Sequence, residues 1–433
     1  MQLVERQSEQ FNHLNVHYIK TEKFKTLYFV VKLKAPLHKD TITKRALLPY
    51  VLRKGTESYP SEVKLQRKLD DLYGATLSLD GAKKGDYHII SARLEIANDK
   101  YIKDEGSLVD DSLALLYELI YRPKVNENAF DKQIFNREKE TLKNSIESVI
   151  DDKMRYANMR LIDEMCKNER YAIRVHGYVE ELEEITEKSL YTYYQNMLLQ
   201  DDIDIYIVGD FEKSFMQQKI RDYFQREKHE PHIFEKEQIQ QLRHKPKIIK
   251  EVQEINQAKL NIGYRTLGTI KDNNYFSLQV FNGLFGGFPS SKLFLNVREK
   301  HSLAYYAASG IESHKGLLLV VSGIDAKDFS KAHEIIDEQL RAIQKGDFTE
   351  ENLEETKKQL VNGLLETLDH PNGIVELLYQ QDLAQITYPL KEIFTNIHHV
   401  TKEDVIQVAN QIQKDTVYLL TSKEGEPNEK DNS

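Results

Sequence analysis

Only one cysteine, Cys166, occurs among the 433 residues of the sequence. A single thiol cannot form a disulfide within the chain, and it excludes the cysteine-rich sites that hold structural zinc or iron–sulfur clusters. Cys166 follows Asp163, Glu164 and Met165 in a helical pattern. We therefore expect a buried or idle thiol at this position rather than a reactive one.

Long apolar runs and an excess of positive charge are missing as well. No run approaches the ~18–20 apolar residues that span a bilayer, and the N-terminal residues lack the basic and then apolar pattern of a signal peptide. The 60 basic and 69 acidic residues give a net charge of -9, whereas nucleic acids and anionic membranes favour a basic surface. We expect a soluble, cytoplasmic protein whose partners are neither nucleic acid nor membrane.

The sequence also lacks the common signatures of catalytic centres. It has no glycine-rich loop followed by Lys and Ser or Thr to hold phosphate, and no Gly-x-Ser-x-Gly turn to present a nucleophilic serine. Six histidines form three close pairs: His13 with His17, His229 with His232, and His398 with His399. The first pair falls in a predicted strand or turn, the second in a segment typical of an exposed linker, and the third cannot face one ligand on a helix. We expect none of these pairs to bind a metal.

What the sequence does contain is the pattern of an α+β protein. Its 40% of hydrophobic and 30% of charged residues are typical of a globular chain, and its length allows two to four domains. The apolar run at 27–33 predicts a buried strand. Apolar spacing then predicts helices at 46–51 and 61–72, and two strands are expected near 75–79 and 87–96.

The second half of the chain repeats this order of elements at an offset of 229 residues. Without a gap, Pro60 and Ser61 fall on Pro289 and Ser290. Identities are few, so the matching order of strand, helix, proline–serine cap, helix and two strands is the stronger indication of a duplication. Each half is predicted to be a mainly antiparallel sheet with helices packed on one face.

A polar, proline-bearing stretch separates the two halves and is typical of a solvated linker. We therefore expect four parts. They are an N-terminal α+β half at 1–225, a linker at 226–250, a C-terminal α+β half at 251–422 and a charged tail at 423–433.

One stretch of the second half carries a specific motif. It runs Phe285-Gly-Gly-Phe-Pro-Ser-Ser-Lys-Leu-Phe-Leu-Asn-Val-Arg-Glu-Lys-His-Ser-Leu-Ala-Tyr305. This stretch closely resembles the carboxyl-half signature of the insulinase/pitrilysin-type peptidases, the inverzincins, and especially of their processing-peptidase-like bacterial branch. The length, the duplicated halves and the central linker extend the resemblance to the whole chain. The resemblance implies two homologous α+β halves that face each other across a cavity.

The resemblance also implies that Arg298 and Tyr305 bind substrate. In the family, the matching arginine and tyrosine reach from the second half to the peptide carbonyl that is held at the zinc. A guanidinium and a phenol are donors that can hold the oxygen on which negative charge builds during amide hydrolysis. The alternative interpretation is a helix-end arginine and a core tyrosine.

The first half departs from the family at the metal site. Active members carry His-x-x-Glu-His on the helix that ends in Lys-Gly-Thr, with two zinc-binding histidines and a glutamate that takes a proton from the zinc-bound water. Counted from Lys54-Gly55-Thr56, the ligand positions are Ala46 and Tyr50, and the position of the base is Pro49. The nearest match to the third ligand, Glu138, is expected to be a solvated carboxylate and not a ligand. We expect no metal in this chain, and a proline that strains the helix by ~3 kcal/mol.

The first functional hypothesis is that the chain is the zinc-free subunit of a heterodimeric zinc metallopeptidase. In some family members one subunit brings the zinc motif and the other brings the arginine and tyrosine. The expected partners are then a homologous zinc-bearing peptidase subunit and a peptide substrate, and zinc, the cofactor, is expected in the partner alone. The resemblance extends to bacterial pairs of an elongation-factor-P modification-associated type. The alternative is a non-catalytic peptide-binding or scaffold protein that acts as a homodimer.

The resemblance further implies that the peptide is bound as an added strand. We expect this at an edge strand near 257–264 or at its first-half counterpart, because main-chain pairing suits varied sequences.

Overall fold

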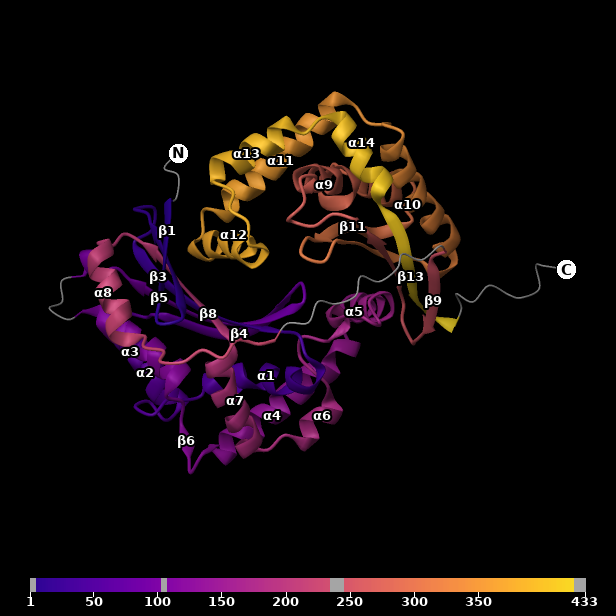
Figure 1. The fold of residues 1–433 in the computed structure, drawn as a ribbon. Helices are drawn as coiled ribbons and strands as arrows, with labels where there is room; N and C mark the ends of the chain where they lie inside the picture. The colour runs from indigo at the N-terminus through magenta and orange to yellow at the C-terminus, as the bar shows by residue number, and fades with distance from the viewer. Residues whose placement is uncertain (1–4, 103–106, 234–244, 424–433) are drawn as a thin grey trace. The chain divides into compact units, whose positions relative to one another are not determined.

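The computed structural model describes residues 5–102, 107–233 and 245–423 (Figure 1). The chain divides into two compact units. Unit 1 comprises Met1–Ser148, Ile173–Lys236 and Asp369–Leu378, and unit 2 comprises Val149–Ala172, Glu237–Leu368 and Tyr379–Ser433. The units are interleaved in sequence, because each contains one short segment from the other half of the chain. The sequence analysis predicted two undivided halves at 1–225 and 251–422, and it did not predict this exchange of segments.

Unit 1 is built on a six-stranded sheet with the order β1-β2-β8-β3-β5-β4. Its strands are β1 (Glu5–Phe11), β2 (Leu14–Lys20), β3 (Thr26–Pro36), β4 (Thr76–Lys84), β5 (Tyr87–Ala97) and β8 (Asp202–Gly209). β3 lies in the middle and pairs antiparallel with β5 and β8, whereas β2 and β8 run parallel. β3 contains the apolar run predicted as a buried strand, and its alternate residues Phe29, Val31 and Leu33 lie in the core.

Unit 2 repeats this topology with one strand fewer, in the order β11-β12-β10-β13-β9. Its strands are β9 (Lys247–Val252), β10 (Ala258–Arg265), β11 (Ala304–Glu312), β12 (Leu317–Ile324) and β13 (Gln413–Thr421). The central β10 pairs antiparallel with β12 and β13, and β13 pairs parallel with β9. These are the directions that β3, β5, β8 and β2 have in unit 1. The shared order and directions confirm the predicted fold class of two homologous α+β halves.

Helices cover one face of the sheet in unit 1, where α1 and α3 contact its strands (Figure 1). The helices of this unit include α1 (Lys39–Leu52), α2 (Glu62–Asp71), α3 (Leu108–Tyr121), α4 (Lys132–Glu147), α6 (Val179–Glu184), α7 (Glu187–Gln200) and α8 (Lys213–Tyr223). β6 (Val125–Asn126) and β7 (Ala129–Phe130) are two-residue strands that pair antiparallel with each other. α2 begins where predicted, because the hydroxyl of Ser61 accepts a hydrogen bond from the N–H of Lys64.

The helices of unit 2 pack on the corresponding face of its sheet, around a core of its own. They include α9 (Tyr275–Asn282), α10 (Phe329–Gln344), α11 (Glu350–Thr367), α13 (Leu390–His399), α14 (Lys402–Gln411) and the π-helices η4 (Gly283–Gly287) and η5 (Phe294–Lys300), whereas α5 (Lys153–Met165) packs on the other face. Short 3₁₀ turns lie at η1 (Asp99–Tyr101), η2 (Ser148–Ile150), η3 (Arg170–Ala172) and η6 (Ala326–Asp328). α12 (Pro371–Ala384) begins in the late segment of unit 1 and ends in unit 2.

The second face of the unit 2 sheet is covered by α5, which comes from the first half of the sequence. α5 packs on β10 and β13. Its residues Ala157 and Leu161 are buried against Tyr418 and Leu420 of β13. Cys166, at the end of this helix, is fully buried, which confirms the prediction of a structural thiol.

The second face of the unit 1 sheet carries polar side chains of β3 that meet the segment Asp369–Leu378. The hydroxyl of Tyr28 on β3 donates a hydrogen bond to Asn372, at 3.1 Å. The ammonium of Lys32, also on β3, lies 2.6 Å from the carboxylate of Glu376. This late segment therefore contributes polar contacts to a sheet whose strands all precede residue 210.

Glu251, at the end of β9, gives unit 2 a pH-dependent component of stability. Its carboxylate accepts hydrogen bonds from the hydroxyls of Tyr156 and Tyr418 at 2.7 and 2.6 Å and from Arg160 at 3.2 Å. Burial opposes ionisation of Glu251, but these donors outweigh it and lower its pKa to about 2. A carboxylate whose pKa is lower in the folded than in the unfolded chain stabilises the fold at neutral pH, and this contribution fades as the pH falls from about 4–5 towards 2.

We expect Glu251→Gln to lower the stability of the protein by about 1–2 kcal/mol at pH 7, after allowing for partial solvent exposure. The deficit should shrink below pH 4 and vanish near pH 2. The measurement is urea unfolding at pH 7, 5, 4 and 3, with the variant of its exposed neighbour, Glu254→Gln, as the matched control. A deficit that stays constant with pH would contradict this assignment.

The predicted site of strand addition is wrong. β10, which covers residues 258–265, is the central strand of its sheet and pairs along both edges with β12 and β13. Its first-half counterpart, β3, is equally central in unit 1. Because each of these strands is paired with a neighbour on both sides, neither has a free edge to receive a peptide.

The first part of the predicted linker is docked on unit 1 rather than solvated. Phe224 is buried and Arg226 is 5% exposed. The guanidinium of Arg226 donates to the carbonyls of Leu198 and Leu199 at 2.8 and 2.9 Å. It thereby satisfies backbone carbonyls at the end of α7 that have no partner within the helix. Residues 234–244 of the predicted linker and 424–433 of the predicted tail lie outside the described residues.

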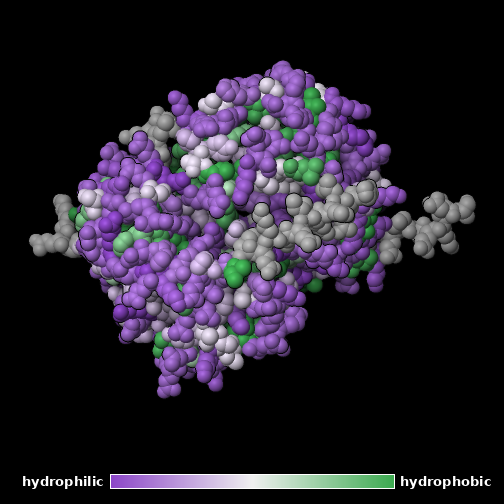
Figure 2. All heavy atoms as spheres, in the orientation of Figure 1, coloured by the Kyte–Doolittle hydropathy of each residue, from purple (hydrophilic) through white to green (hydrophobic). Residues whose placement is uncertain are grey.

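Hydrophilic residues dominate the face of the molecule seen in Figure 2, and hydrophobic residues are scattered among them. Among the helices of the described residues, none combines the length and the apolar character that crossing a bilayer requires.

Candidate functional site

The motif stretch of the second half folds around the two π-helices η4 and η5. At the end of η5, the N–H of His301 donates to the carbonyl of Asn296, five residues earlier, at 3.3 Å. π-Helical turns are rare and occur frequently at functional sites. Ser302 follows with a φ of 51°, a left-handed conformation that is uncommon outside glycine. The backbone between Arg298 and Tyr305 therefore departs from regular helix before the next strand begins.

Tyr305 occupies a bulge at the start of β11. Ala304 lies opposite Ile324 and Tyr306 lies opposite Gly323, so Tyr305 is an extra residue in this strand. A bulge turns a side chain away from the direction that the regular ladder would give it. The side chain of Tyr305 is 72% exposed, so the alternative interpretation as a core tyrosine is wrong.

Arg298 is exposed on η5, and its guanidinium carbon lies 4.6 Å from the centre of the Phe294 ring one turn earlier. This cation–π contact restrains the arginine side chain while its N–H groups stay available. Within the described residues, neither Arg298 nor Tyr305 makes a side-chain hydrogen bond or ion pair. Both side chains therefore offer donors to an external acceptor.

The remaining residues of the motif hold this arrangement in place. Leu293 and Val297 are fully buried and anchor η5 in the core of unit 2. A Cβ at Gly286 would lie 2.7 Å from the backbone nitrogen of Ser309 on β11. Glycine at this position lets η4 approach the strand that carries Tyr305. The apolar and glycine positions of the motif thus serve packing and leave the arginine and tyrosine in solvent.

The degenerate zinc-motif positions of the first half lie on α1 against the core of unit 1. Ala46 and Pro49 are buried, and Tyr50 packs on the same core with the guanidinium of Arg53 5.2 Å from its ring centre. α1 continues through Pro49 to Leu52. Alanine and proline side chains offer no donor atom to a metal, so these positions do not fit a zinc ion.

Glu138 on α4 is buried, at 2% exposure, and the prediction of a solvated carboxylate is wrong. Its carboxylate accepts a hydrogen bond from Arg137 at 2.8 Å, and the ammonium of Lys54 lies 3.5 Å away. A buried carboxylate needs such cationic partners, because an unpaired buried charge is strongly destabilising. The residue nearest to the family's third ligand is thus engaged by two cations of its own chain.

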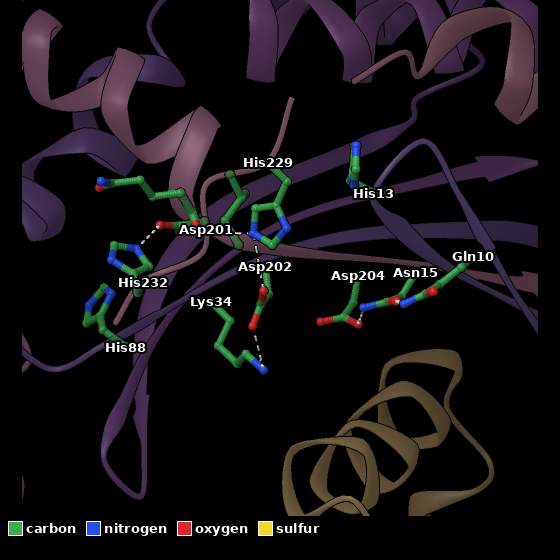
Figure 3. Close-up of polar contacts among 12 residues, drawn as sticks. Gln10, His13, Asn15, Lys34, His88, Asp201, Asp202, Asp204, His229 and His232 are labelled. Carbon is green, nitrogen blue, oxygen red and sulfur yellow. Dashed lines mark hydrogen bonds and ion pairs between the residues drawn. The ribbon is translucent and has the colours of Figure 1, made fainter. Parts of the chain in front are cut away.

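The histidines at 229 and 232 tie their segment to the start of β8 (Figure 3). Nε2 of His232 lies 3.1 Å from Asp201, and Nε2 of His229 lies 3.4 Å from Asp202. Burial lowers the pKa of His229, and the nearby guanidinium of Arg226 lowers it further. Across residues 5–102, 107–233 and 245–423, no group of three or more His, Cys, Asp or Glu side chains is placed to hold a metal ion.

We predict that the purified chain contains no stoichiometric zinc, because Ala46, Pro49 and Tyr50 replace the two histidines and the glutamate of the family motif. Elemental analysis after purification without chelators should find far less than one zinc per chain. A zinc-bearing relative purified in parallel is the control. A value near one zinc per chain would contradict the prediction.

Sequence comparisons relate the chain to metalloprotease-like proteins. Residues 184–360 match the family described as Peptidase M16 inactive domain. The sequence is 48% identical to "Probable inactive metalloprotease YmfF" of Bacillus subtilis (strain 168), over 98% of this chain and 100% of that protein. It is 30% identical to "Uncharacterized zinc protease YmxG" of the same organism, over 40% of this chain and 43% of that protein.

Solved structures show the same fold over nearly the whole chain. A conserved protein from Enterococcus faecalis V583 superimposes with a TM-score of 0.88 and 35% identity, covering 98% of this chain and 100% of that one. A structure described as the peptidase M16 inactive domain from Pseudomonas fluorescens gives a TM-score of 0.80 at 15% identity, covering 97% and 99%. The chain therefore belongs to the M16 family of insulinase/pitrilysin-type peptidases, as an inactive, metalloprotease-like member.

Proposed function

We propose that this chain is the zinc-free, substrate-holding subunit of a heterodimeric zinc metallopeptidase. In this proposal, Arg298 and Tyr305 donate to the carbonyl oxygen of a peptide whose scissile bond is held at the zinc of a homologous partner chain. The observation that carries the proposal is the exposed phenol of Tyr305 on its bulge, in a stretch otherwise fixed by buried residues.

The chemistry of the two side chains suits this role. As water attacks the amide, negative charge builds on the carbonyl oxygen, and fixed donors aimed at that oxygen stabilise the transition state. The guanidinium of Arg298 offers N–H donors, and the phenol of Tyr305 offers an O–H donor. Neither has a competing acceptor among the described residues. The motif positions of α1, in contrast, carry alanine, proline and tyrosine in place of two histidines and a glutamate, so in this proposal the metal comes from another chain.

The names of three relatives support the choice of partner and substrate. Bacillus subtilis has both a relative called a probable inactive metalloprotease and one called a zinc protease. A third relative, 31% identical over 34% of this chain and 37% of its own length, is named for the biosynthesis of the antilisterial bacteriocin subtilosin. We propose that the substrate is a peptide and that a zinc-bearing homologue from the same organism is the partner.

The test is reconstitution of peptidase activity from two purified chains. The chain is mixed with a zinc-bearing homologue from its own organism, and cleavage of a peptide mixture is followed by mass spectrometry. We expect cleavage by the mixture, little or none by either chain alone, and co-elution of the two chains in size-exclusion chromatography. A stable homodimer that neither binds the homologue nor increases its activity would overturn the proposal and favour the scaffold alternative.

A further inference from the structure

Unit 2 leaves open the edge of its sheet that unit 1 fills with a strand. β9 is the outer strand of the unit 2 sheet, where it pairs parallel with β13 (Figure 1). Its counterpart in unit 1 is β2, which pairs parallel with β8. There, β1 adds to β2 in an antiparallel ladder that runs along the whole length of β2. Among the strands of the described residues, none takes the corresponding place beside β9.

This open edge exposes apolar side chains whose counterparts in β2 are buried. Ile248 is 56% exposed and Val252 is 38% exposed. Ile248 lies opposite Val417 of the unit 2 core, and opposite residues of neighbouring strands point to the same face of a sheet. In unit 1, Val16 lies opposite Ile205 of the core in the same way, and it is fully buried. β9 therefore carries a core-type surface without the neighbours that bury it in unit 1.

The residues just before β9 cannot repeat the tight hairpin that joins β1 to β2. That hairpin turns at Asn12 and His13, whose φ angles are 45° and 61°. Two-residue turns of this kind need a positive φ at both positions. The two residues before β9 are Lys245 and Pro246, and the ring of proline fixes φ near −65°. A strand beside β9 therefore cannot be joined to it in the way that β1 is joined to β2.

Lys250 lies between Ile248 and Val252 on the same face of β9 and determines which strand fits there. Its side chain is exposed, with the ammonium 5.3 Å from the centre of the Phe329 ring. If two copies of β9 paired antiparallel with Ile248 opposite Val252, Lys250 would lie opposite Lys250 of the second copy. Like charges directly opposite each other destabilise a sheet, and lysines on edge strands prevent such self-association. A strand with apolar, acidic and apolar residues at alternating positions instead matches all three side chains.

We propose that the outer edge of β9 binds a strand of a partner protein in which an acidic residue is flanked, at alternating positions, by two apolar β-branched residues. The strand runs antiparallel to β9, as β1 does to β2, with its acidic residue opposite Lys250. Its apolar residues lie opposite Ile248 and Val252. β9 and β11 are the two edges of the five-stranded sheet, about 19 Å apart at ~4.8 Å per strand, so this surface is separate from Tyr305. The proposal does not depend on the proposed peptidase function.

The experiment measures the binding of fluorescent heptapeptides to the full chain by fluorescence anisotropy. The Glu probe is acetyl-Thr-Val-Thr-Glu-Thr-Val-Thr-amide, and the Lys probe has lysine in place of glutamate. The wild-type chain should bind the Glu probe at least about 3-fold more tightly than the Lys probe. Lys250→Glu should reverse this preference. Lys245→Glu, which changes an exposed lysine just before β9, is the matched control and should keep the wild-type preference.

Amide hydrogen exchange in the wild-type chain locates the bound strand and needs no variant. Saturating Glu probe should slow the exchange of alternate amides in residues 247–252, whereas residues 416–421 of β13, which already pair with β9, should be unchanged. Equal binding of both probes, or a preference that Lys250→Glu leaves as it is, would overturn the proposal. It is equally overturned if every amide of β9 is protected without the probe, because a second copy or another segment of this chain then covers the edge.

Discussion

Tyr305→Phe should lower the turnover of the reconstituted two-chain peptidase by about 10²–10³-fold, or roughly 3–4 kcal/mol of transition-state stabilisation. Arg298→Ala should have an effect of similar size. The charge that these donors hold develops only in the transition state, so kcat should fall much more than KM changes. Both side chains are exposed and support no core contact of the described residues, so folding and assembly should be unaffected.

The adjacent tyrosine provides a matched control for this prediction. The hydroxyl of Tyr306 is buried and has no hydrogen-bond partner in the described structure. Tyr306→Phe therefore removes the same atom one position away, and turnover should stay near the wild-type value. Equal rates for wild type and Tyr305→Phe, with the partner chain shown to be bound, would remove the proposed role of the pair and leave the scaffold alternative.

Glu376→Gln should destabilise the protein by about 3–5 kcal/mol, the usual cost of leaving one member of a buried ion pair without its partner. Lys32 is the group left behind, and its side chain is 1% exposed. Burial already lowers the pKa of Lys32 although Glu376 opposes this shift. Loss of Glu376 should therefore drive Lys32 towards its neutral form, which keeps the cost near the lower end of the range at high pH. Urea unfolding at pH 6 and pH 9 measures both effects.

Two further variants separate the buried pair from ordinary surface charges. Asp369→Asn breaks the surface ion pair between Asp369, which is 62% exposed, and Lys23, which is 42% exposed. This change should alter stability by less than about 1 kcal/mol. Lys32→Met in the Glu376→Gln background removes the stranded ammonium and should recover much of the loss. A Glu376→Gln variant that unfolds at the same urea concentration as Asp369→Asn would show that the buried pair contributes little.

The parts of this fold that sequence predicted are those fixed by local patterns. β3 and β10 follow from short apolar runs, and α2 follows from Ser61 and the spacing of its leucines. β1 was not predicted, because its sequence Glu-Arg-Gln-Ser-Glu-Gln-Phe has no apolar alternation and its conformation depends on pairing with β2. The π-helical form of η5 was not predicted either, since the apolar spacing of 294–300 fits a regular helix equally well.

Within the candidate site, the family resemblance singled out Arg298 and Tyr305 as candidate residues. It did not predict the bulge that exposes the tyrosine. Glu138 was misjudged because its burial and its contact with Lys54, which follows α1, arise only when α1 and α4 pack together. The pairing of Lys32 with Glu376 was missed because it joins residues 344 positions apart in the chain. The one sign of this pairing in the sequence was Lys32 itself. A charged residue in the middle of an apolar run indicates that a partner of opposite charge lies close to it in the fold.

The pairing of Lys32 with Glu376 has a consequence for biosynthesis, because these residues are 344 positions apart in the chain. The strands of unit 1 are all translated by residue 209, whereas the segment that neutralises Lys32 ends at residue 378. At about 5–20 residues per second, the ribosome needs roughly 8–35 s for the intervening stretch of about 170 residues. During that interval the nascent sheet has to remain unaggregated with one face uncovered. The lysines on this face, Lys32 and Lys34 of β3, favour this outcome, because like charges repel other nascent chains that expose the same surface.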